Sequence, residues 1–320
     1  MRRIRVGVIG VGYLGQHHAR LYADLPGAVL AGITDANLDR ARAIGDRYRV
    51  PVFPDPDSLL KRVDAVSIAV PTAAHYDVAK ACLSAGVHVL VEKPITATLA
   101  EAHGLVELAR QARRTLQVGH VERFNPVIRA VRPYIKKPGF IECHRLSPFI
   151  DRGTDVDVVL DLMIHDLDMV LSFDPGPVEE VHAAGVAVLS SNIDIANARI
   201  SFGSGCVANL TASRVSTTRM RRLRLFQRDL YLSVDYQTRQ GIICRRRSGQ
   251  DGRPEIETEP IRGGDDEPLR LQLEAFVRAA ATGERPLVSG EHGAAALDLA
   301  HRVLRAIDDF LRRHGEPRAL

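Results

Sequence analysis

A glycine-rich turn between a strand pattern and a helix pattern constrains the fold of this chain more than any other feature. The turn GVGYLG, residues 10–15, follows the apolar run Ile4–Ile9 and opens a helix pattern that continues to Leu25. Its glycines let the backbone turn tightly and approach a pyrophosphate, which then lies at the helix N-terminus. The motif alone is weak, but a preceding strand and a following helix are the context that dinucleotide binding requires. The pattern predicts a Rossmann domain with cofactor contacts from Gly10, Gly12, Tyr13, Leu14 and Gly15.

The first 120 residues alternate short apolar runs with helix patterns. Near-continuous apolar runs are typical of strands buried on both faces, and intervening helices imply that the strands are parallel. We therefore expect an α/β domain over residues 1–121, built on a doubly wound parallel sheet that binds NAD. Its expected strands cover residues 4–9, 29–34, 65–70, 87–91 and 116–119, and its expected helices cover residues 13–25, 38–48, 76–85 and 99–113.

After residue 125 the pattern changes to one long helix followed by several extended runs. Turns that contain glycine, such as residues 203–205, join consecutive runs and predict an antiparallel sheet. We expect a second, α+β domain over residues 122–320, in which the polar segment 250–267 is a surface loop. Its expected helices cover residues 156–173, 268–281 and 293–313, and its expected strands cover residues 178–189, 194–202, 206–213, 222–226, 231–236 and 241–246.

Asp35 closes the second predicted strand about twenty residues after the last glycine of the turn. A carboxylate in this position accepts hydrogen bonds from the adenosine ribose and repels a 2′-phosphate, so the sequence favours NAD over NADP. The alternative is a glycine-rich turn followed by a surface aspartate. Arg40 lies too far along the next predicted helix to reverse the preference, although it leaves some use of NADP open.

Polar residues follow the third and fifth predicted strands. Ligands of parallel α/β sheets bind outside the carboxyl ends of the strands. Thr72 and His75 follow the strand at 65–70, and His120 follows the strand at 116–119, so we expect all three to line the cofactor site. A capping or exposed role for His75, and a linker role for the segment 117–126, are the alternatives.

Lys93 is unusual because the chain has 43 Lys and Arg residues but only five lysines. Lysine can lose its proton when it is desolvated or placed near another cation, which arginine cannot do. Lys93 follows an apolar strand pattern within Glu92-Lys93-Pro94, where an exposed lysine is less expected. A functional amine and an ordinary lysine with its head group in solvent are equally compatible with this position.

Asp161, His165 and Asp168 share one face of the predicted helix 156–173, because they are spaced i, i+4 and i+7. Asp161 has apolar neighbours and needs a partner if it is buried. His165 is available, and a carboxylate–imidazole pair can fix the tautomer of a general base. A structural pair and a divalent metal site are alternatives, but no further His or Cys at ligand spacing supports a metal, and we expect none.

Composition narrows the class of protein. The net charge of +4 is mild, and the arginine clusters at 219–224 and 245–247 lack a nucleic-acid-binding motif, so no nucleic acid is expected as a partner. The four cysteines form no CxxC pair, which fits a reducing cytoplasm. No run of about 18 apolar residues is present, so we expect no membrane span.

These motifs together resemble the Gfo/Idh/MocA oxidoreductase family over essentially the whole chain. The family hallmarks EKP and DxxxHxxD are Glu92-Lys93-Pro94 and Asp161, His165, Asp168 in this sequence. The resemblance implies a Rossmann domain joined to an open-faced antiparallel sheet domain, with Lys93, Asp161 and His165 around the reacting alcohol and Glu92 and Lys93 near the cofactor. It also implies a homodimer or homotetramer that forms through the antiparallel sheet.

A narrower resemblance is carried by VGHVERFNP, HRLSPFIDRGTDVDVVLDLMIHDLD and DIANARISF. These segments are similar to the subgroup that oxidises the 3-hydroxyl of UDP-N-acetylglucosamine, on the route to a 3-amino sugar of lipid A. The resemblance implies that the sugar hydroxyls and diphosphate are contacted by Arg123, Asn125, Arg152 and Arg214. An inositol, a free aldose or a dihydrodiol as substrate remains an alternative, as does a non-catalytic NAD-binding regulator.

Overall fold

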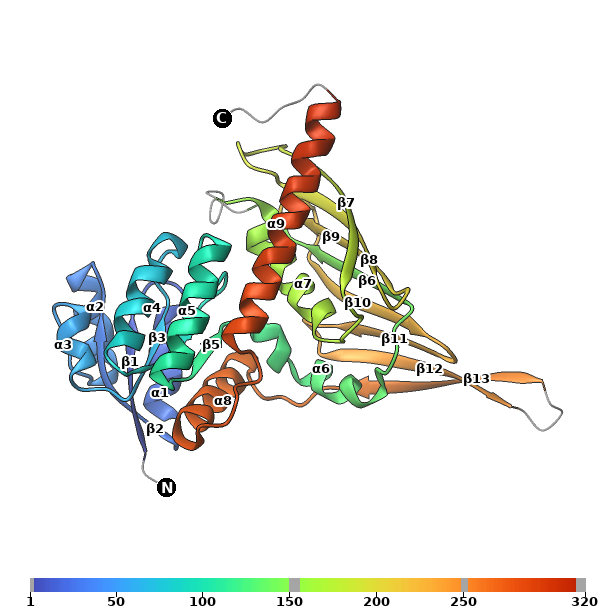
Figure 1. Ribbon diagram of the computed structural model, residues 1–320. Helices are drawn as coiled ribbons and strands as arrows, with labels where there is room; N and C mark the ends of the chain where they lie inside the picture. Colours follow the sequence, from blue (N-terminus) through green and yellow to red (C-terminus); the bar gives the residue numbers. More distant parts are fainter. Residues whose placement is uncertain (1–2, 150–155, 249–252, 315–320) are drawn as a thin grey trace. The chain divides into compact units, whose positions relative to one another are not determined.

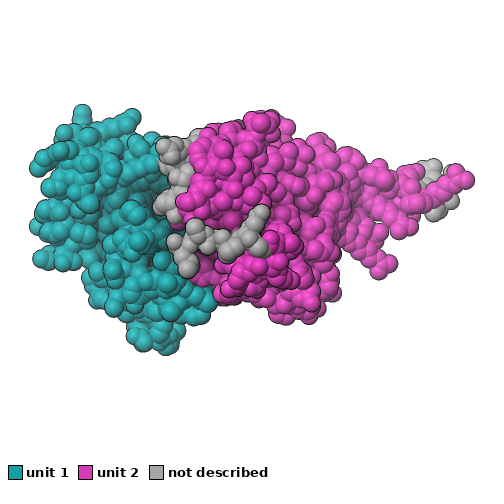
Figure 2. Space-filling model, turned by 90° about the horizontal axis from the view of Figure 1, so that it is seen from above, with its two compact units in different colours: residues 1–121, 266–295 teal, residues 122–265, 296–320 magenta. Residues whose placement is uncertain are grey.

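The computed structural model describes residues 3–149, 156–248 and 253–314, which form two compact units. Unit 1 comprises Met1–Val121 and Asp266–Ala295, and unit 2 comprises Glu122–Asp265 and Ala296–Leu320 (Figure 2). The expected domain division shares the boundary after residue 121. It differs in the segment 266–295, which sequence analysis assigned to the second domain.

Unit 1 is built on a five-stranded sheet in the order β2-β1-β3-β4-β5, in which all neighbouring strands are parallel (Figure 1). The expected Rossmann architecture is therefore confirmed. The strands are β1 (Ile4–Ile9), β2 (Ala28–Thr34), β3 (Ala65–Ile68), β4 (His88–Val91) and β5 (Leu116–Val118). The helices are α1 (Gly15–Asp24), α2 (Leu38–Tyr48), α3 (Pro56–Leu60), α4 (His75–Ser84), α5 (Leu99–Ala112) and α8 (Pro268–Thr282), with a 3-10 turn, η1 (Thr72–Ala74).

Helix α8 joins unit 1 because its apolar face completes the core on one side of the sheet. Leu273, Phe276 and Val277 are buried in the same cluster as Val8 of β1 and Leu21 of α1. The chain after α8 also extends the edge of the sheet, since the Val118 amide donates to the Val288 carbonyl at 3.0 Å. Burial of this surface is the main favourable contribution to docking the segment 266–295.

Unit 2 is built on an eight-stranded sheet in the order β13-β12-β11-β10-β6-β9-β8-β7. Neighbours are antiparallel except β6 and β9, which are parallel, so the expected antiparallel sheet is mixed at its centre. The strands are β6 (Phe140–Leu146), β7 (Val178–Val186), β8 (Ile195–Phe202), β9 (Val207–Ser213), β10 (Met220–Gln227), β11 (Leu230–Asp235), β12 (Gln240–Ser248) and β13 (Pro254–Arg262).

Two of these strands were not expected. Segment 250–267 was predicted as a loop, but Pro254–Arg262 forms the edge strand β13, whose side chains are almost all exposed. The prediction was wrong because an exposed strand carries no apolar alternation. Strand β6 was missed because Glu142, His144 and Arg145 make the segment polar, although its alternate residues are buried.

The helices of unit 2 cover one face of its sheet (Figure 1). The single helix expected over 156–173 is a π-helical turn, η4 (Val159–Met163), followed by α7 (Ile164–Leu171). The other helical segments are η2 (Val121–Phe124), α6 (Pro126–Val131), η3 (Arg132–Tyr134) and α9 (Gly290–Arg313), which begins in unit 1 and continues into unit 2. Among the described residues, no helix is both long and apolar enough to cross a membrane.

Candidate active site

The loop after β1 is shaped for a dinucleotide. Gly10 has φ +83°, and a Cβ there would lie 2.7 Å from the Ala69 carbonyl oxygen. A Cβ on Gly15 would collide with the Gly10 carbonyl oxygen, whereas a Cβ on Gly12 would meet nothing within 4 Å. Helix α1 begins without a side-chain cap or an acidic residue in its first turn, which leaves its N-terminus suited to an anion. These features fit NAD, whose pyrophosphate the glycine loop and the N-terminus of α1 would hold.

The candidate cofactor residues lie at one edge of the parallel sheet. Gly10, Asp35 and Lys93 follow β1, β2 and β4 within two residues, His120 follows β5 equally closely, and Thr72 lies four residues beyond β3. Because the strands are parallel, these positions share the carboxyl edge, where ligands of such sheets bind. The large side chains of Tyr13 and Leu14, in the loop itself, are exposed.

Asp35 is buried at the end of β2, and its carboxylate has several donors. The amides of Val11 and Asn37 donate to it at 2.7 and 2.8 Å. The guanidinium of Arg40 donates to both oxygens, at 3.2 and 2.7 Å. Burial would raise the pKa of Asp35, but the hydrogen bonds from Arg40 and the two amides hold it below its usual value. Arg40 was expected to lie too far along the helix to reverse the preference for NAD, but its side chain reaches back from the first turn of α2 to Asp35.

Glu92 is a buried carboxylate directly before Lys93. Its Oε1 lies 3.2 Å from Nε2 of His18, which α1 buries completely. Burial would raise the pKa of Glu92, but the His18 contact and the charges of His18, Lys93 and His75 lower it. A Cβ on Gly119 would lie 2.6 Å from the Glu92 carboxylate, so glycine at this position makes room for the buried acid. His18 was not predicted from the sequence, because a histidine in the second turn of a helix pattern gives no local signal.

His75 is also buried, and its ring contacts two segments at the carboxyl edge of the parallel sheet. Its Nδ1 lies 2.8 Å from the Pro94 carbonyl oxygen, and its Nε2 lies 2.9 Å from the Val70 carbonyl oxygen. Burial lowers the pKa of His75 against the opposing effect of these carbonyls. The ring therefore links the end of β3 to the chain just after Lys93. This geometry favours a role in positioning Lys93 over direct contact with the cofactor.

The proton-handling candidates of unit 2 lie on consecutive helical segments. Asp161 belongs to the π-helical turn and His165 to the first turn of α7, and both are half-buried. Asp168 is buried, and its Oδ1 lies 3.5 Å from Nη1 of Arg123 on η2. In the described ranges no group of three or more His, Cys, Asp or Glu side chains is arranged to hold a metal ion.

Asn125 is buried within unit 2, and its amide makes internal bonds. Its Nδ2 donates to Glu122 at 3.2 Å and to the Tyr236 carbonyl at 3.1 Å, and its Oδ1 caps α6 by accepting from the Val127 amide at 3.2 Å. This favours a structural role over the expected contact with substrate. Arg152 lies outside the described residues.

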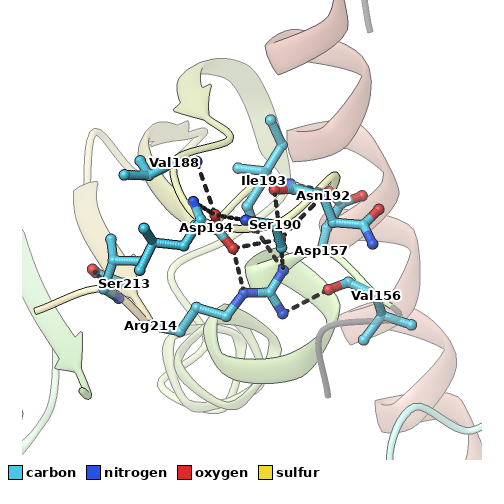
Figure 3. A network of polar contacts seen from close by, with 11 residues as sticks. Val156, Asp157, Val188, Ser190, Asn192, Ile193, Asp194, Ser213 and Arg214 are labelled. Atoms are coloured by element: carbon cyan, nitrogen blue, oxygen red, sulfur yellow. Dashed lines mark hydrogen bonds and ion pairs between the residues drawn. The ribbon is translucent and has the colours of Figure 1, made fainter. Parts of the chain in front are cut away.

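Arg214 lies in a buried polar network with Asp194 (Figure 3). Its Nε donates to Asp194 at 2.8 Å, and its Nη1 donates to the Val156 carbonyl at 2.8 Å, just before the helical segment that carries Asp161. Asp194 also accepts from three backbone amides and from the Ser190 hydroxyl. Burial would raise its pKa, but these hydrogen bonds hold it well below its usual value. The arrangement favours Arg214 as an anchor of the helix start over a direct sugar contact.

Arg145 is a second residue that sequence analysis missed. It is buried on β6 and donates to Asp166 of α7 and to Glu122 of η2. The signal that could have found it is the alternation of β6, in which Ile141, Cys143 and Arg145 share the buried face. A buried arginine on an apolar face requires carboxylate partners.

Comparison with known proteins identifies both units of the chain. Residues 4–120 match the family model of an oxidoreductase family with an NAD-binding Rossmann fold, and residues 106–229 match the GFO/IDH/MocA C-terminal domain. The UDP-N-acetylglucosamine 3-dehydrogenase of Acidithiobacillus ferrooxidans is 39% identical over 98% of this chain and 100% of its own length. A solved structure of that enzyme superimposes with a TM-score of 0.93, with coverage of 98% of this chain and 100% of the other.

More distant relatives agree in fold. The myo-inositol 2-dehydrogenase of Thermotoga maritima is 26% identical, with coverage of 96% of this chain and 97% of its own. A levoglucosan dehydrogenase solved with NADH and levoglucosan shares the fold at a TM-score of 0.85 and 18% identity, over 96% of this chain and 98% of its own. The similarity therefore extends across both units, and the chain belongs to the Gfo/Idh/MocA family of NAD-binding oxidoreductases.

Proposed function

We propose that this chain oxidises the 3-hydroxyl of UDP-N-acetylglucosamine to a ketone, with NAD as the oxidant. The observation that carries the proposal is the 39% identity to an enzyme of that activity over the full length of both chains. Lys93, Asp161 and His165 are all present, and a dehydrogenase needs such groups to handle the proton of an alcohol.

In the proposed reaction, His165 removes the proton of the sugar hydroxyl and Asp161 stabilises the imidazolium that forms. Lys93 donates a hydrogen bond to the same oxygen and stabilises its developing negative charge, or accepts the proton itself. NAD, when bound, would supply the hydride acceptor for this oxidation. Gly10, Gly12 and Gly15 would hold its pyrophosphate, and Asp35 would bind its adenosine ribose.

The test is NADH formation, followed at 340 nm, with a panel of UDP-sugars, free aldoses, inositol and a dihydrodiol. We expect turnover with UDP-N-acetylglucosamine at a kcat/KM at least 100-fold above that of every free sugar. Preferred turnover of inositol or of a free aldose would reassign the substrate within the same fold. NAD binding without turnover of any compound would indicate a cofactor-binding regulator instead.

The proposed product defines where the reaction belongs. A 3-keto sugar nucleotide is the substrate that an aminotransferase converts into a 3-amino sugar, so we place the reaction in the cytoplasmic supply of 3-amino sugar for lipid A. We further propose a homodimer or homotetramer that forms through the face of the eight-stranded sheet opposite α7 and α9. In the described part of the chain no helix covers that face.

A further inference from the structure

Helix α7 carries His165, and two neighbouring acidic residues of the same helix are held by ion pairs. Asp166 is paired with Arg145 of β6, and Asp168 is paired with Arg123 of η2. Both aspartates are buried. Helix α7 is thus held by ion pairs at Asp166, the residue next to the candidate base His165, and again at Asp168.

The Arg145 pair is the stronger of the two. Its Nε and Nη2 donate to the two oxygens of Asp166 at 2.9 and 2.8 Å, and its Nη1 donates to Glu122 at 3.0 Å. The side chains of Arg145, Asp166 and Glu122 are 4%, 3% and 8% exposed. A two-pronged guanidinium–carboxylate contact fixes orientation as well as distance. The ring of Tyr236 lies 5.6 Å from the guanidinium carbon and closes another side.

Glu122 and Arg123 are consecutive residues of η2, and they reach α7 by different routes. Glu122 acts through Arg145 on Asp166, whereas Arg123 contacts Asp168 directly. Both contacts lie within unit 2, and Glu122 and Arg123 follow the end of β5 by four and five residues. We call Glu122, Arg123, Arg145, Asp166 and Asp168 the α7 clasp.

Stability alone does not account for a buried charge network of this kind. Desolvation of buried ions offsets much of their attraction, and apolar replacements of equal volume are often as stable. What such a network supplies is a fixed geometry. Helix α7 has particular need of it, because the π-helical turn Val159–Met163 directly before it interrupts the regular α-helical hydrogen bonds.

We propose that Arg145 is a positioning residue for catalysis, which fixes the rotation and register of α7 through Asp166 and so holds His165 in its reactive orientation. This inference rests on the proposed function, because it assigns a task to His165. Arg145 itself contacts neither substrate nor cofactor in this proposal. A displacement of a reacting group by about 1 Å can cost on the order of 100-fold in rate.

The test compares Arg145→Met with Arg224→Met in the full-length protein. Arg224 of β10 is the control. It pairs at 2.7 Å with Glu142, which lies on the same strand as Arg145, β6, but on the opposite face of the sheet. We expect Arg145→Met to lower kcat by 10- to 100-fold, while the Kd for NAD changes by less than twofold. Arg224→Met should keep kcat within twofold of the unaltered protein. A kcat of Arg145→Met within twofold of the unaltered protein, or an equal loss in both variants, would overturn the proposal.

A second pair of variants separates positioning from folding. Arg145→Lys keeps the charge but loses the two-pronged contact, so it should fold and still lose at least fivefold in kcat. The triple variant Arg145→Met/Asp166→Leu/Glu122→Gln removes all three charges of the Arg145 network and should restore the melting temperature without restoring kcat. Recovery of kcat together with the melting temperature would mean that the pair serves only the fold.

Hydrogen exchange tests the clasp without any substrate. Amides of Ile164–Leu171 should exchange at least tenfold faster in Arg145→Met than in Arg224→Met, with NAD bound in both. If the unaltered protein oxidises no sugar on the panel, the proposed function fails, but this exchange difference still shows whether Arg145 holds α7. Equal exchange rates in the two variants would show that Arg145 does not hold α7, even if the proposed substrate is correct.

Discussion

Lys93 lies half-buried at the carboxyl edge of the Rossmann sheet, and its neighbours hold it from both sides. Glu92 is fixed beneath Gly119 and beside His18, and the Pro94 carbonyl is bound by His75. A lysine that only served solubility would not need a buried acid and a buried histidine on either side. The residue therefore has the surroundings of a functional amine.

Replacement of this amine tests its role directly. We expect Lys93→Met to bind NAD with unchanged affinity and to lose on the order of 100-fold or more in kcat, because the reacting oxygen loses its cationic hydrogen-bond donor. Isothermal titration with NAD and steady-state rates provide the two measurements. Lys61→Met, an exposed lysine after α3, is the control and should retain full activity. More than half of the original activity in Lys93→Met would remove Lys93 from the mechanism.

Arg40 is a second residue whose role can be tested. Its guanidinium pairs with the carboxylate of Asp35, which should bind the adenosine ribose. Its guanidinium is half exposed and can turn from Asp35 toward a 2′-phosphate. We expect Arg40→Ala to lower kcat/KM for NADP about tenfold, on the scale of one charge-assisted contact. The value for NAD should change less than threefold. Initial rates with both cofactors measure the effect, and an unchanged NADP rate would show that Arg40 has no part in cofactor choice.

The sequence predicts residue positions well where chemistry and strand ends coincide. Asp35, Lys93 and His120 each lie one or two residues after a strand, and a strand end is readable from an apolar run. His18 and Arg145 were missed for a physical reason, since each acts through a carboxylate that is distant in the sequence. A pairing between residues 18 and 92, or 145 and 166, requires the tertiary fold.

At the scale of elements, the network of Asp194 and Arg214 anchors the start of the segment that carries Asp161. The Asp194 carboxylate accepts five hydrogen bonds, and Arg214 passes the connection on to Val156. The Ile193 amide also donates to Asp157 at 2.9 Å, so the loop and the helix start are fixed together.

We expect Asp194→Asn to lower the free energy of unfolding by about 3 kcal/mol at pH 7, because it leaves the buried Arg214 without its counter-ion. The folded protein holds the pKa of Asp194 below its usual value. The contribution of the carboxylate is therefore complete above the unfolded pKa of about 3.9 and is lost as the pH falls through the lower folded value.

Urea denaturation at a series of pH values measures both parts of this prediction. The difference between the two proteins should be constant from pH 7 to about pH 5 and should narrow below about pH 4. Asp39→Asn, a surface aspartate, should change stability by less than about 1 kcal/mol. A difference that grows as the pH falls would contradict the assignment.

Elements with an apolar period were predictable, and those without one were not. The runs at 4–9 and 38–48 match β1 and α2 at both ends. Strand β13 has no buried face, so its sequence shows no apolar alternation. The hydrogen bonds of the π-helical turn span one residue more than those of an α-helix, and a turn this short leaves no distinct period in the sequence.

At the scale of the whole molecule, the exposed face of the eight-stranded sheet is the interface of the proposed oligomer. Asn209 lies on this face in the interior strand β9, beside Arg199 of β8. We expect Asn209→Arg to shift the proposed oligomer toward monomer, because a further positive charge would face its symmetry copy across an isologous contact. Light scattering after size exclusion measures the mass, and an unchanged oligomer would exclude this face as the interface.

The division of the molecule into units was only partly predictable. The change of pattern near residue 121 marks the first crossing between units, because parallel and antiparallel sheets leave different sequence periods. No change in the sequence period indicates that Asp266–Ala295 belongs to unit 1. Leu273 and Phe276 fit the apolar face of any helix, and only the fold shows that they pack on α1 and β1.

Unit 1 is formed from two separate stretches of the chain, so its parts are synthesised at different times. The ribosome releases all five strands of the Rossmann sheet early, but α8 follows only after the intervening residues 122–265. At ordinary translation rates these 144 residues take roughly 7 to 30 s, during which the apolar surface that α8 will cover stays open. Unit 2 waits as well, since its core includes Val303 and Ile307 of α9, which follows α8 in the chain. Neither unit can therefore complete its apolar core until α8 and α9 have been synthesised, well after the Rossmann sheet has left the ribosome.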